Sequence, residues 1–213
     1  VQPQPLPLEH SDDGVTPIES FPPEERPYVE FVRSLDVSQF RQVRGWQARY
    51  LTPGQLQSIP NNRTFRTLPG AVRRNLTTDQ LQSLNVRRSG LLGLTRGQIN
   101  QLTTEQIHSL RLRDFKRLAP HQIPELTVAQ IRRIPSMRWF HRFKLPQREA
   151  FTTNQVRALD VRKTGLAGLS ADQVAVLTGR QIESLWEKDI AFLNADQLTM
   201  LTPQQLEWLD PAW

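Results

Sequence analysis

Basic and aromatic side chains alternate along one run of the chain, residues 132–144. The run reads Arg-Arg-Ile-Pro-Ser-Met-Arg-Trp-Phe-His-Arg-Phe-Lys, so cations and rings stand next to one another. Such a segment can stack on bases and neutralise phosphates, press rings into an anionic membrane interface, or anchor an acidic protein. The candidate partner-binding residues in this run are Arg132, Arg133, Arg138, Trp139, His141, Arg142, Phe143 and Lys144. Alternatively, the run is a long loop whose rings fill the joint between two repeated halves of the chain while its arginines face water.

Three further basic pairs would widen this surface if they share its face: Arg73 and Arg74, Arg87 and Arg88, and Arg162 and Lys163. The net charge of +6 is unevenly spread, at −6 for residues 1–36, +17 for residues 37–165 and −5 for residues 166–213. A basic middle between acidic ends predicts an acidic partner, with an acidic protein first, nucleic acid second and an anionic membrane third. A solvated basic surface partly neutralised by the protein's own tail is the alternative.

The residue types for most enzyme chemistry are missing or badly spaced. The chain has no cysteine, which excludes disulfides, thiolate metal sites and a cysteine nucleophile. The four histidines, at 10, 108, 121 and 141, form no metal-ligand spacing with a carboxylate. Glycines form no phosphate-binding loop, and no serine nucleophile elbow occurs. We therefore expect a non-enzymatic protein with no metal and no cofactor.

The first 27 residues differ in composition from the rest. They contain seven of the 16 prolines and six acidic residues. Proline fixes φ and removes a backbone donor, so we expect residues 1–27 to form an acidic, extended and flexible arm. No apolar run approaches the roughly 20 residues that a membrane-spanning helix needs.

The rest of the chain is built on a recurring phrase, Leu-Thr-x-x-Gln-aliphatic-x-x-aliphatic. A clear copy is Leu76-Thr77-Thr78-Asp79-Gln80-Leu81-Gln82-Ser83-Leu84. A threonine N-cap accepts from the N3 amide, a glutamine at N3 accepts from the N-cap amide, and the preceding leucine packs on the residue at N4. Each phrase therefore predicts the start of a helix with its apolar residues on one face.

The phrase glutamines follow an unequal order of steps that occurs twice. They stand at positions 55, 80, 98, 106, 122, 130, 155, 173, 181, 197 and 205. The steps are 25, 18, 8, 16 and 8, and then the same again, so position 130 is equivalent to position 55 and position 155 to position 80. This separation is called one period below. We predict an all-α, solenoid-like array of short helices over residues 28–213, built from a duplicated unit of about 75 residues at 55–129 and 130–204, with partial units on both sides.

The duplication also separates architecture from function. Residues present in both copies, such as Phe65 and Phe140, are expected to be scaffold. Most of the basic and aromatic residues of 132–144 occur only in the second copy, so they are free to serve a partner.

The tandem Leu-Thr-x-x-Gln phrases resemble the short-helix repeat regions of large secreted bacterial effectors and toxins. The resemblance covers about residues 28–213, and it implies a virulence-related binding scaffold that is secreted or delivered into a host. Residues 51–59, Leu-Thr-Pro-Gly-Gln-Leu-Gln-Ser-Ile, are also similar to the opening of a TAL-effector DNA-binding repeat. The uniform repeat and base-reading loop of that family do not appear here, so nucleic-acid binding would go through the phosphate backbone.

Deleting the acidic arm, residues 1–27, tests whether it screens the basic stretch. The deletion removes six acids and one arginine, so affinity for a polyanion should rise at low salt and change little at high salt. A titration with a labelled polyanion at two salt concentrations measures this effect. Unchanged affinity would make the arm a spacer, and loss of the fold would contradict its assignment as peripheral.

Overall fold

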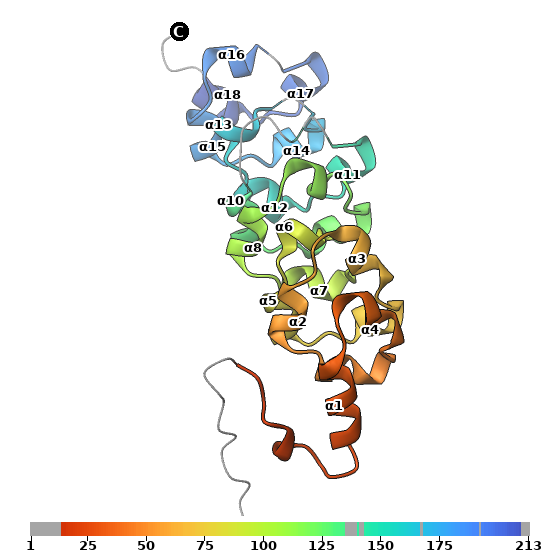
Figure 1. The fold of residues 1–213 in the computed structure, drawn as a ribbon. Coiled ribbons are helices and arrows are strands. Elements are labelled where there is room, and N and C mark those ends of the chain that lie inside the picture. The colour runs from red at the N-terminus through yellow and green to blue at the C-terminus, as the bar shows by residue number, and fades with distance from the viewer. Residues whose placement is uncertain (1–13, 135–139, 141–142, 167, 192, 210–213) are drawn as a thin grey trace, which may run out of the picture. The chain divides into compact units, whose positions relative to one another are not determined.

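The computed structural model describes residues 14–134, 140, 143–166, 168–191 and 193–209. Every regular element in these residues is a helix, and no strand occurs among them (Figure 1). The prediction of an all-α fold made of many short helices is confirmed. The chain divides into two compact units, residues 1–94 and 95–213, which are called unit 1 and unit 2 below.

Unit 1 begins with the three-residue η1 and the nine-residue α1, and α1 contacts η1 and η3. Other neighbouring elements in this unit are α4 with η3, α2 with α5 and α3 with α6. Its elements are η1 (Ile18–Ser20), α1 (Arg26–Ser34), η2 (Val37–Gln42), η3 (Gly45–Tyr50), α2 (Pro53–Gln57), α3 (Asn62–Thr67), α4 (Gly70–Arg74), α5 (Thr78–Ser83) and α6 (Val86–Ser89).

Among its described residues, unit 2 contains α7 to α18 and the 3-10 helix η4. Neighbouring elements in it are α8 with α10, α10 with α12, α7 with η4, α14 with α17 and α15 with α18. Its elements are α7 (Arg96–Asn100), α8 (Thr104–Ser109), α9 (Leu112–Phe115), η4 (Pro120–Glu125), α10 (Val128–Arg133), α11 (Leu145–Glu149), α12 (Thr153–Ala158), α13 (Val161–Thr164), α14 (Ala171–Ala175), α15 (Gly179–Glu183), α16 (Glu187–Ile190), α17 (Ala195–Thr199) and α18 (Pro203–Leu209).

The phrase glutamines cap these helices as the sequence predicts. In α12 the Thr152 hydroxyl accepts from the Gln155 amide at 3.3 Å, and the Gln155 Oε1 atom accepts from the Thr152 amide at 3.0 Å. The same glutamine bond, at 2.8 to 3.1 Å, heads the helices that begin after residues 52, 77, 95, 103, 127, 170, 178, 194 and 202. Because helices of five or six residues have few internal bonds, this cap satisfies a large share of their amides.

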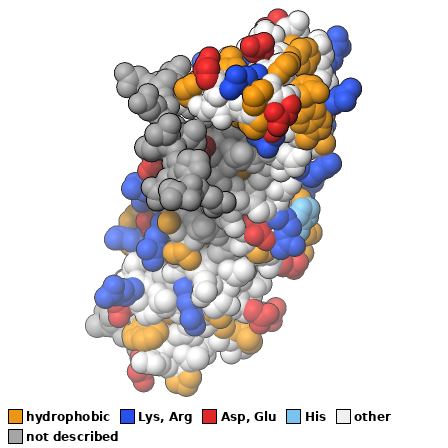
Figure 2. Space-filling view, turned by 90° about the horizontal axis from the view of Figure 1, so that it is seen from below, with side chains coloured by type: hydrophobic (Ala, Val, Ile, Leu, Met, Phe, Trp, Pro, Cys, Tyr) orange, Lys and Arg blue, Asp and Glu red, His pale blue; other side chains and the backbone are white. Residues whose placement is uncertain are grey.

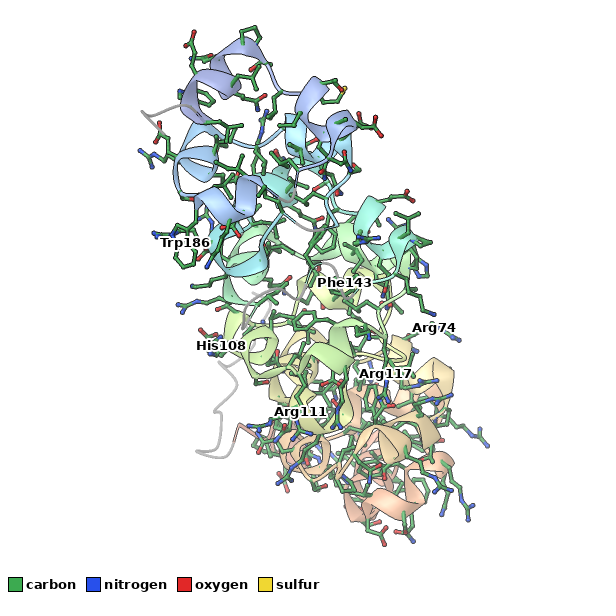
Figure 3. The ribbon with its side chains drawn as sticks, turned by 90° about the horizontal axis from the view of Figure 1, so that it is seen from above. Arg74, His108, Arg111, Arg117, Phe143 and Trp186 are labelled. Atoms are coloured by element: carbon green, nitrogen blue, oxygen red, sulfur yellow. The ribbon has the colours of Figure 1, made fainter. Side chains whose placement is uncertain are left out.

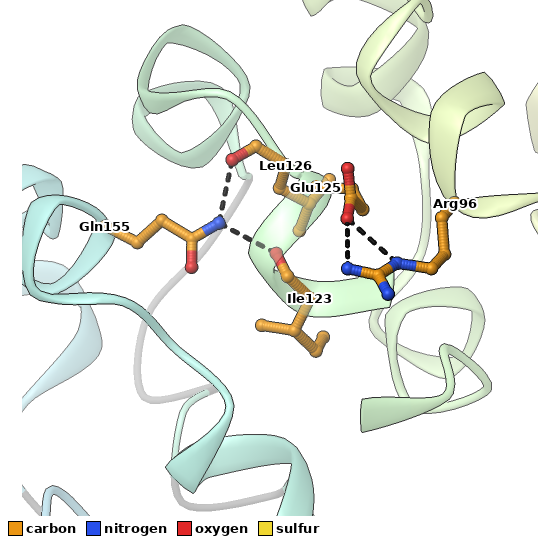
Figure 4. Close-up of polar contacts among 5 residues, drawn as sticks. All are labelled: Arg96, Ile123, Glu125, Leu126 and Gln155. Atoms are coloured by element: carbon orange, nitrogen blue, oxygen red, sulfur yellow. Dashed lines mark hydrogen bonds and ion pairs between the residues drawn. The ribbon is translucent and has the colours of Figure 1, made fainter. Parts of the chain in front are cut away.

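The other end of most of these glutamine carboxamides makes a bond that the capping pattern does not predict. In unit 1 the Gln80 Nε2 atom donates to the carbonyls of Ala48 and Leu51, both at 2.8 Å. In unit 2 the Gln155 Nε2 atom donates to the carbonyls of Ile123 and Leu126, both at 2.7 Å (Figure 4). One buried side chain therefore caps its own helix and ties it to the end of an earlier helical turn.

This second bond recurs through both units. It joins Gln55 to Val32 and Leu35, Gln130 to Ile99 and Leu102, Gln147 to Lys116 and Leu118, Gln181 to Val156 and Leu159, Gln205 to Ala175 and Leu177, Gln173 to Arg148, and Gln197 to Leu169.

The three apolar positions of the phrase form the core, as predicted. In the copy at α5, Leu76, Leu81 and Leu84 are buried, and in the copy at α8 Leu102, Ile107 and Leu110 are buried. Gly90 and Gly165 end α6 and α13 with φ of 67° and 69°, a backbone conformation that glycine adopts without strain.

The described part of the proline-rich segment, residues 14–27, packs on the rest of unit 1. The Glu25 carboxylate accepts from Arg49 at 2.6 Å and from the Tyr50 hydroxyl at 2.8 Å, and the rings of Phe21 and Tyr50 meet edge to face. Burial is the main cause of the raised pKa of Tyr50, which keeps its hydroxyl a neutral donor to Glu25. Helix α1 begins at Arg26, inside the predicted arm, and residues 1–13 lie outside the described residues.

Replacing Gln155 by alanine should lower the free energy of unfolding by about 2–3 kcal/mol, because it removes a cap and leaves two buried carbonyls without their donor. Asn154→Ala on the same helix is the matched control, since Asn154 is exposed and should change stability by less than about 0.5 kcal/mol. Urea denaturation followed by circular dichroism measures both values. Equal effects for the two variants would contradict the structural role of the carboxamide.

Candidate partner-binding surface

Eight of the predicted cations lie exposed at helix ends, among them Arg162 and Lys163 at the end of α13. Arg132 and Arg133 occupy the last turn of α10, Arg87 and Arg88 the last turn of α6, and Lys144 precedes α11. Arg74, at the end of α4, is also exposed and projects from the ribbon in Figure 3. Arg138, Trp139, His141 and Arg142 lie outside the described residues.

Except for Lys144, which precedes α11, the positions of these cations have a local physical cause. A helix C-terminus carries unsatisfied carbonyls and a partial negative charge, so arginine and lysine are favoured in its last turn. Basic residues close α3, α4, α6, α10, α12 and α13 in this way. Part of the basic charge therefore stabilises the many short helices, and only part is open to a partner.

Arg132 and Arg133 differ in their surroundings. Among the described residues neither makes a salt bridge, but Arg133 lies near Glu105 of α8. The pKa of Glu105 is lowered first by hydrogen bonds from its own backbone amide and the Thr104 hydroxyl, and further by the charge of Arg133. The carbonyl of Arg133 also lies 3.0 Å from the His108 Nδ1 atom, which ties the end of α10 to α8. The positive charge of Arg132 is therefore offset less by nearby negative charge than that of Arg133.

Phe143 lies in the core, unlike the neighbouring cations of the predicted run. It is 4% exposed, and its ring centroid is 6.5 Å from that of Phe140 and 6.0 Å from that of Phe151 (Figure 3). Phe140 and Phe151 are themselves 5.0 Å apart, so the three rings form one aromatic cluster. Phe143 therefore supports the packing of unit 2, and its ring is not presented to a partner.

Arg73 is likewise engaged by the fold. Its guanidinium lies against Gly93, where any added Cβ atom would collide with Nη1. Burial, followed by the charges of Arg66 and Arg74, lowers the pKa of Arg73. At the equivalent position one period later, Arg148 donates from Nη1 to the carbonyl of Gly168 at 3.0 Å. This arginine position holds the glycine turn, which makes Arg73 a structural residue.

Arg162 and Lys163 on α13 lie exposed in unit 2 beside an aromatic residue that the sequence analysis missed. Trp186 is 47% exposed, with the Arg162 guanidinium 5.4 Å and the Lys188 ammonium 3.9 Å from its ring centroid (Figure 3). Lys163 pairs with Asp160 at 3.1 Å. The arrangement offers one flat ring and two cations together.

The repeated order of residues in the sequence contains a signal for Trp186. It lies one period after Arg111, and the two residues occupy the same local structure, because both backbone amides donate to an aspartate at the third position after them. A tryptophan in place of an arginine at a position that faces solvent marks a residue peculiar to the second copy.

On the face seen in Figure 2, Lys and Arg side chains lie among acidic and apolar side chains. Within the residues that the structure describes, no group of three or more His, Asp or Glu side chains could hold a metal ion. No helix of that part of the chain is long and apolar enough to cross a membrane. Comparisons with protein-family models, curated proteins and solved structures found no match.

Phe143→Ala should lower the free energy of unfolding by about 3–5 kcal/mol, because it opens a cavity in the aromatic cluster. Arg132→Ala, at the start of the same predicted run, should change it by less than about 0.5 kcal/mol. Denaturant titration of the two variants checks both values. A destabilisation of comparable size for Arg132→Ala would show that this arginine is part of the fold.

Proposed function

We propose that the chain is a non-enzymatic scaffold built as a solenoid-like array from a duplicated unit of about 75 residues. Five helices of the first copy have bounds that recur one period later, in the pairs α4 and α11, α5 and α12, α6 and α13, α7 and α14, and α9 and α16. The carbonyls that accept from Gln80, at 48 and 51, likewise stand one period before those that accept from Gln155, at 123 and 126. Matching bounds and matching bonds support one architecture used twice.

The scaffold binds an acidic macromolecule, and an acidic protein is the first candidate. The observation that carries this proposal is the exposed pair at the end of α10, Arg132 and Arg133, which no salt bridge within the described residues neutralises. Lys144 adds a third exposed cation, and Arg162 with Trp186 adds a ring flanked by positive charge in the same unit. Arginine and tryptophan are the residue types that contribute most to protein interfaces.

Nucleic acid is the second candidate, and one observation favours it. An exposed ring flanked by two cations, as Trp186 is by Arg162 and Lys188, can stack on a base while the cations meet phosphates.

The repeated phrase supports an origin in a secreted bacterial effector or toxin, acting outside the bacterium or inside a host cell.

Binding can be measured by fluorescence anisotropy with a labelled oligoglutamate, a DNA strand and an RNA strand, at about 50 mM and about 300 mM salt. The protein should bind oligoglutamate at low salt. Arg132→Glu with Arg133→Glu should weaken that binding about tenfold or more, because it places like charges against the ligand. Tighter binding of nucleic acid than of oligoglutamate, with a steep dependence on salt, would favour the second candidate.

A double variant with the same change in net charge provides the control. Arg63 and Arg66 are exposed on α3, and Arg63→Glu with Arg66→Glu should weaken binding by less than about threefold. Equal losses in the two double variants would show a general field effect of net charge rather than a surface around α10. No binding of any of the three ligands at low salt would overturn the proposal.

A further inference from the structure

The glutamine carboxamides of unit 2 differ in how many hydrogen bonds their Nε2 atoms donate. Gln155 and Gln181 each donate to two backbone carbonyls. Gln173 of α14 and Gln197 of α17 each donate to one carbonyl, at 2.7 and 2.8 Å respectively. Because a carboxamide nitrogen carries two hydrogens, each of these two side chains keeps one donor that no described residue accepts.

Both of these carboxamides line one cavity of about 370 Å³, which is lined by Arg148 as well. Its walls come from α11, α14 and α17, which follow one another along unit 2 (Figure 1), and from the turns before α14 and α17. The Arg148 Nη1 atom donates to the carbonyl of Gly168 at 3.0 Å, and its Nε atom is buried without a partner in the described chain. The guanidinium also makes no salt bridge there, so its charge is not neutralised. A half-buried cation beside two unused amide donors favours a carboxylate, whose two oxygens accept from several donors at once.

A second cavity lies beside the first and carries the opposite charge. Its volume is about 400 Å³, and Glu149, Ser170 and Gln173 line both cavities. Asp172 lines the second cavity together with Glu149, and both carboxylates are exposed. Neither forms a salt bridge with a described residue. The second cavity therefore favours a cation.

Apolar side chains form another part of the wall of the second cavity. They belong to Phe151, Val156 and Val176. A cation on an aliphatic stem can lay the stem against such side chains and keep its charged end at a carboxylate. A carboxylate at one end and a cation on an aliphatic stem at the other occur together in a lysine or arginine whose carboxyl group is free.

We propose that the two cavities together bind a lysine or arginine with a free carboxylate, either as an amino acid or as the last residue of a protein chain. The carboxylate accepts from Arg148, Gln173 and Gln197, and the side-chain cation lies at Glu149 and Asp172. None of these residues belongs to the exposed pair at the end of α10, so the inference does not depend on the acidic partner.

Binding is measured on the full chain by the NMR signals of the Gln173 and Gln197 carboxamides, with Nα-acetyl-lysine as the probe. Both signals should shift and saturate, because both Nε2 atoms gain an acceptor. Nα-acetyl-norleucine lacks the ammonium group and Nα-acetyl-lysinamide lacks the carboxylate, so each should bind at least about fivefold more weakly. Equal binding of the three probes, or no shift of either carboxamide signal, would overturn the proposal.

Glu149→Gln tests the cationic end of the site with little effect on the fold, since Glu149 is exposed. It should weaken binding of Nα-acetyl-lysine at least about threefold and leave binding of Nα-acetyl-norleucine unchanged. Glu183→Gln on α15 is the matched control, because Glu183 is exposed and lines neither cavity, and it should change neither affinity. The same loss in both variants, or a loss for both probes, would contradict the placement of the cation.

Two further probes distinguish a free amino acid from the end of a protein chain. Free lysine and a short peptide that ends in lysine share the carboxylate and the side chain but differ at the α-nitrogen. Tighter binding of free lysine would assign the site to an amino acid, and tighter binding of the peptide would assign it to the C-terminus of a protein. Binding of neither would overturn this proposal and leave the partner-binding proposal standing.

Discussion

The fold depends on the glutamine carboxamide that stands at the third position of many of its short helices. A helix of five or six residues has more unsatisfied backbone groups than residues, so it is not stable alone in water. The Oε1 atom of each such glutamine accepts from the N-cap amide, and the Nε2 atom donates to carbonyls at the end of an earlier turn. A buried amide group is stable in this position because nearly all of its capacity is used. The same group therefore sets where a helix begins and which earlier turn it packs on.

The capping half of this arrangement could be predicted from the sequence, and the packing half could not. Capping joins residues three apart, so Thr152 and Gln155 identify one another without any knowledge of the fold. The acceptors of Gln155 lie 29 and 32 residues earlier, and nothing in their residue types marks them, because they act through backbone carbonyls. The helix of Gln147 has a lysine, Lys144, at its N-cap where the phrase has a threonine, so the sequence phrase does not mark this glutamine. Its role is seen only in its hydrogen bonds to Lys144, Lys116 and Leu118.

The sequence predicts which charged side chains of the candidate surface are exposed better than it predicts which aromatic rings are exposed. Exposed cations such as Arg132 and Lys144 were expected, since burial of an unpaired charge is costly. A ring carries no such constraint, so Phe143 in the core and Trp186 at the surface cannot be told apart by residue type. Arg73 shows the limit for cations too, because its stem and part of its guanidinium pack against a glycine turn that only the fold brings near.

Short helices also account for much of the basic charge. Each added helix end provides a new set of carbonyls that favours arginine or lysine in the last turn, so an array that restarts its helix so often accumulates cations for structural reasons. Net charge alone is therefore weak evidence for a polyanionic partner. The informative cations are those that the duplication does not repeat and that no acid within the described residues neutralises. Arg132 meets both conditions, since the residue one period earlier is Gln57, and Arg133 meets them in part because Glu105 is near it. Residues of this kind can differ between equivalent positions without disturbing the glutamine hydrogen bonds that hold the helices together. For this reason a binding surface can change while the scaffold that carries it stays the same.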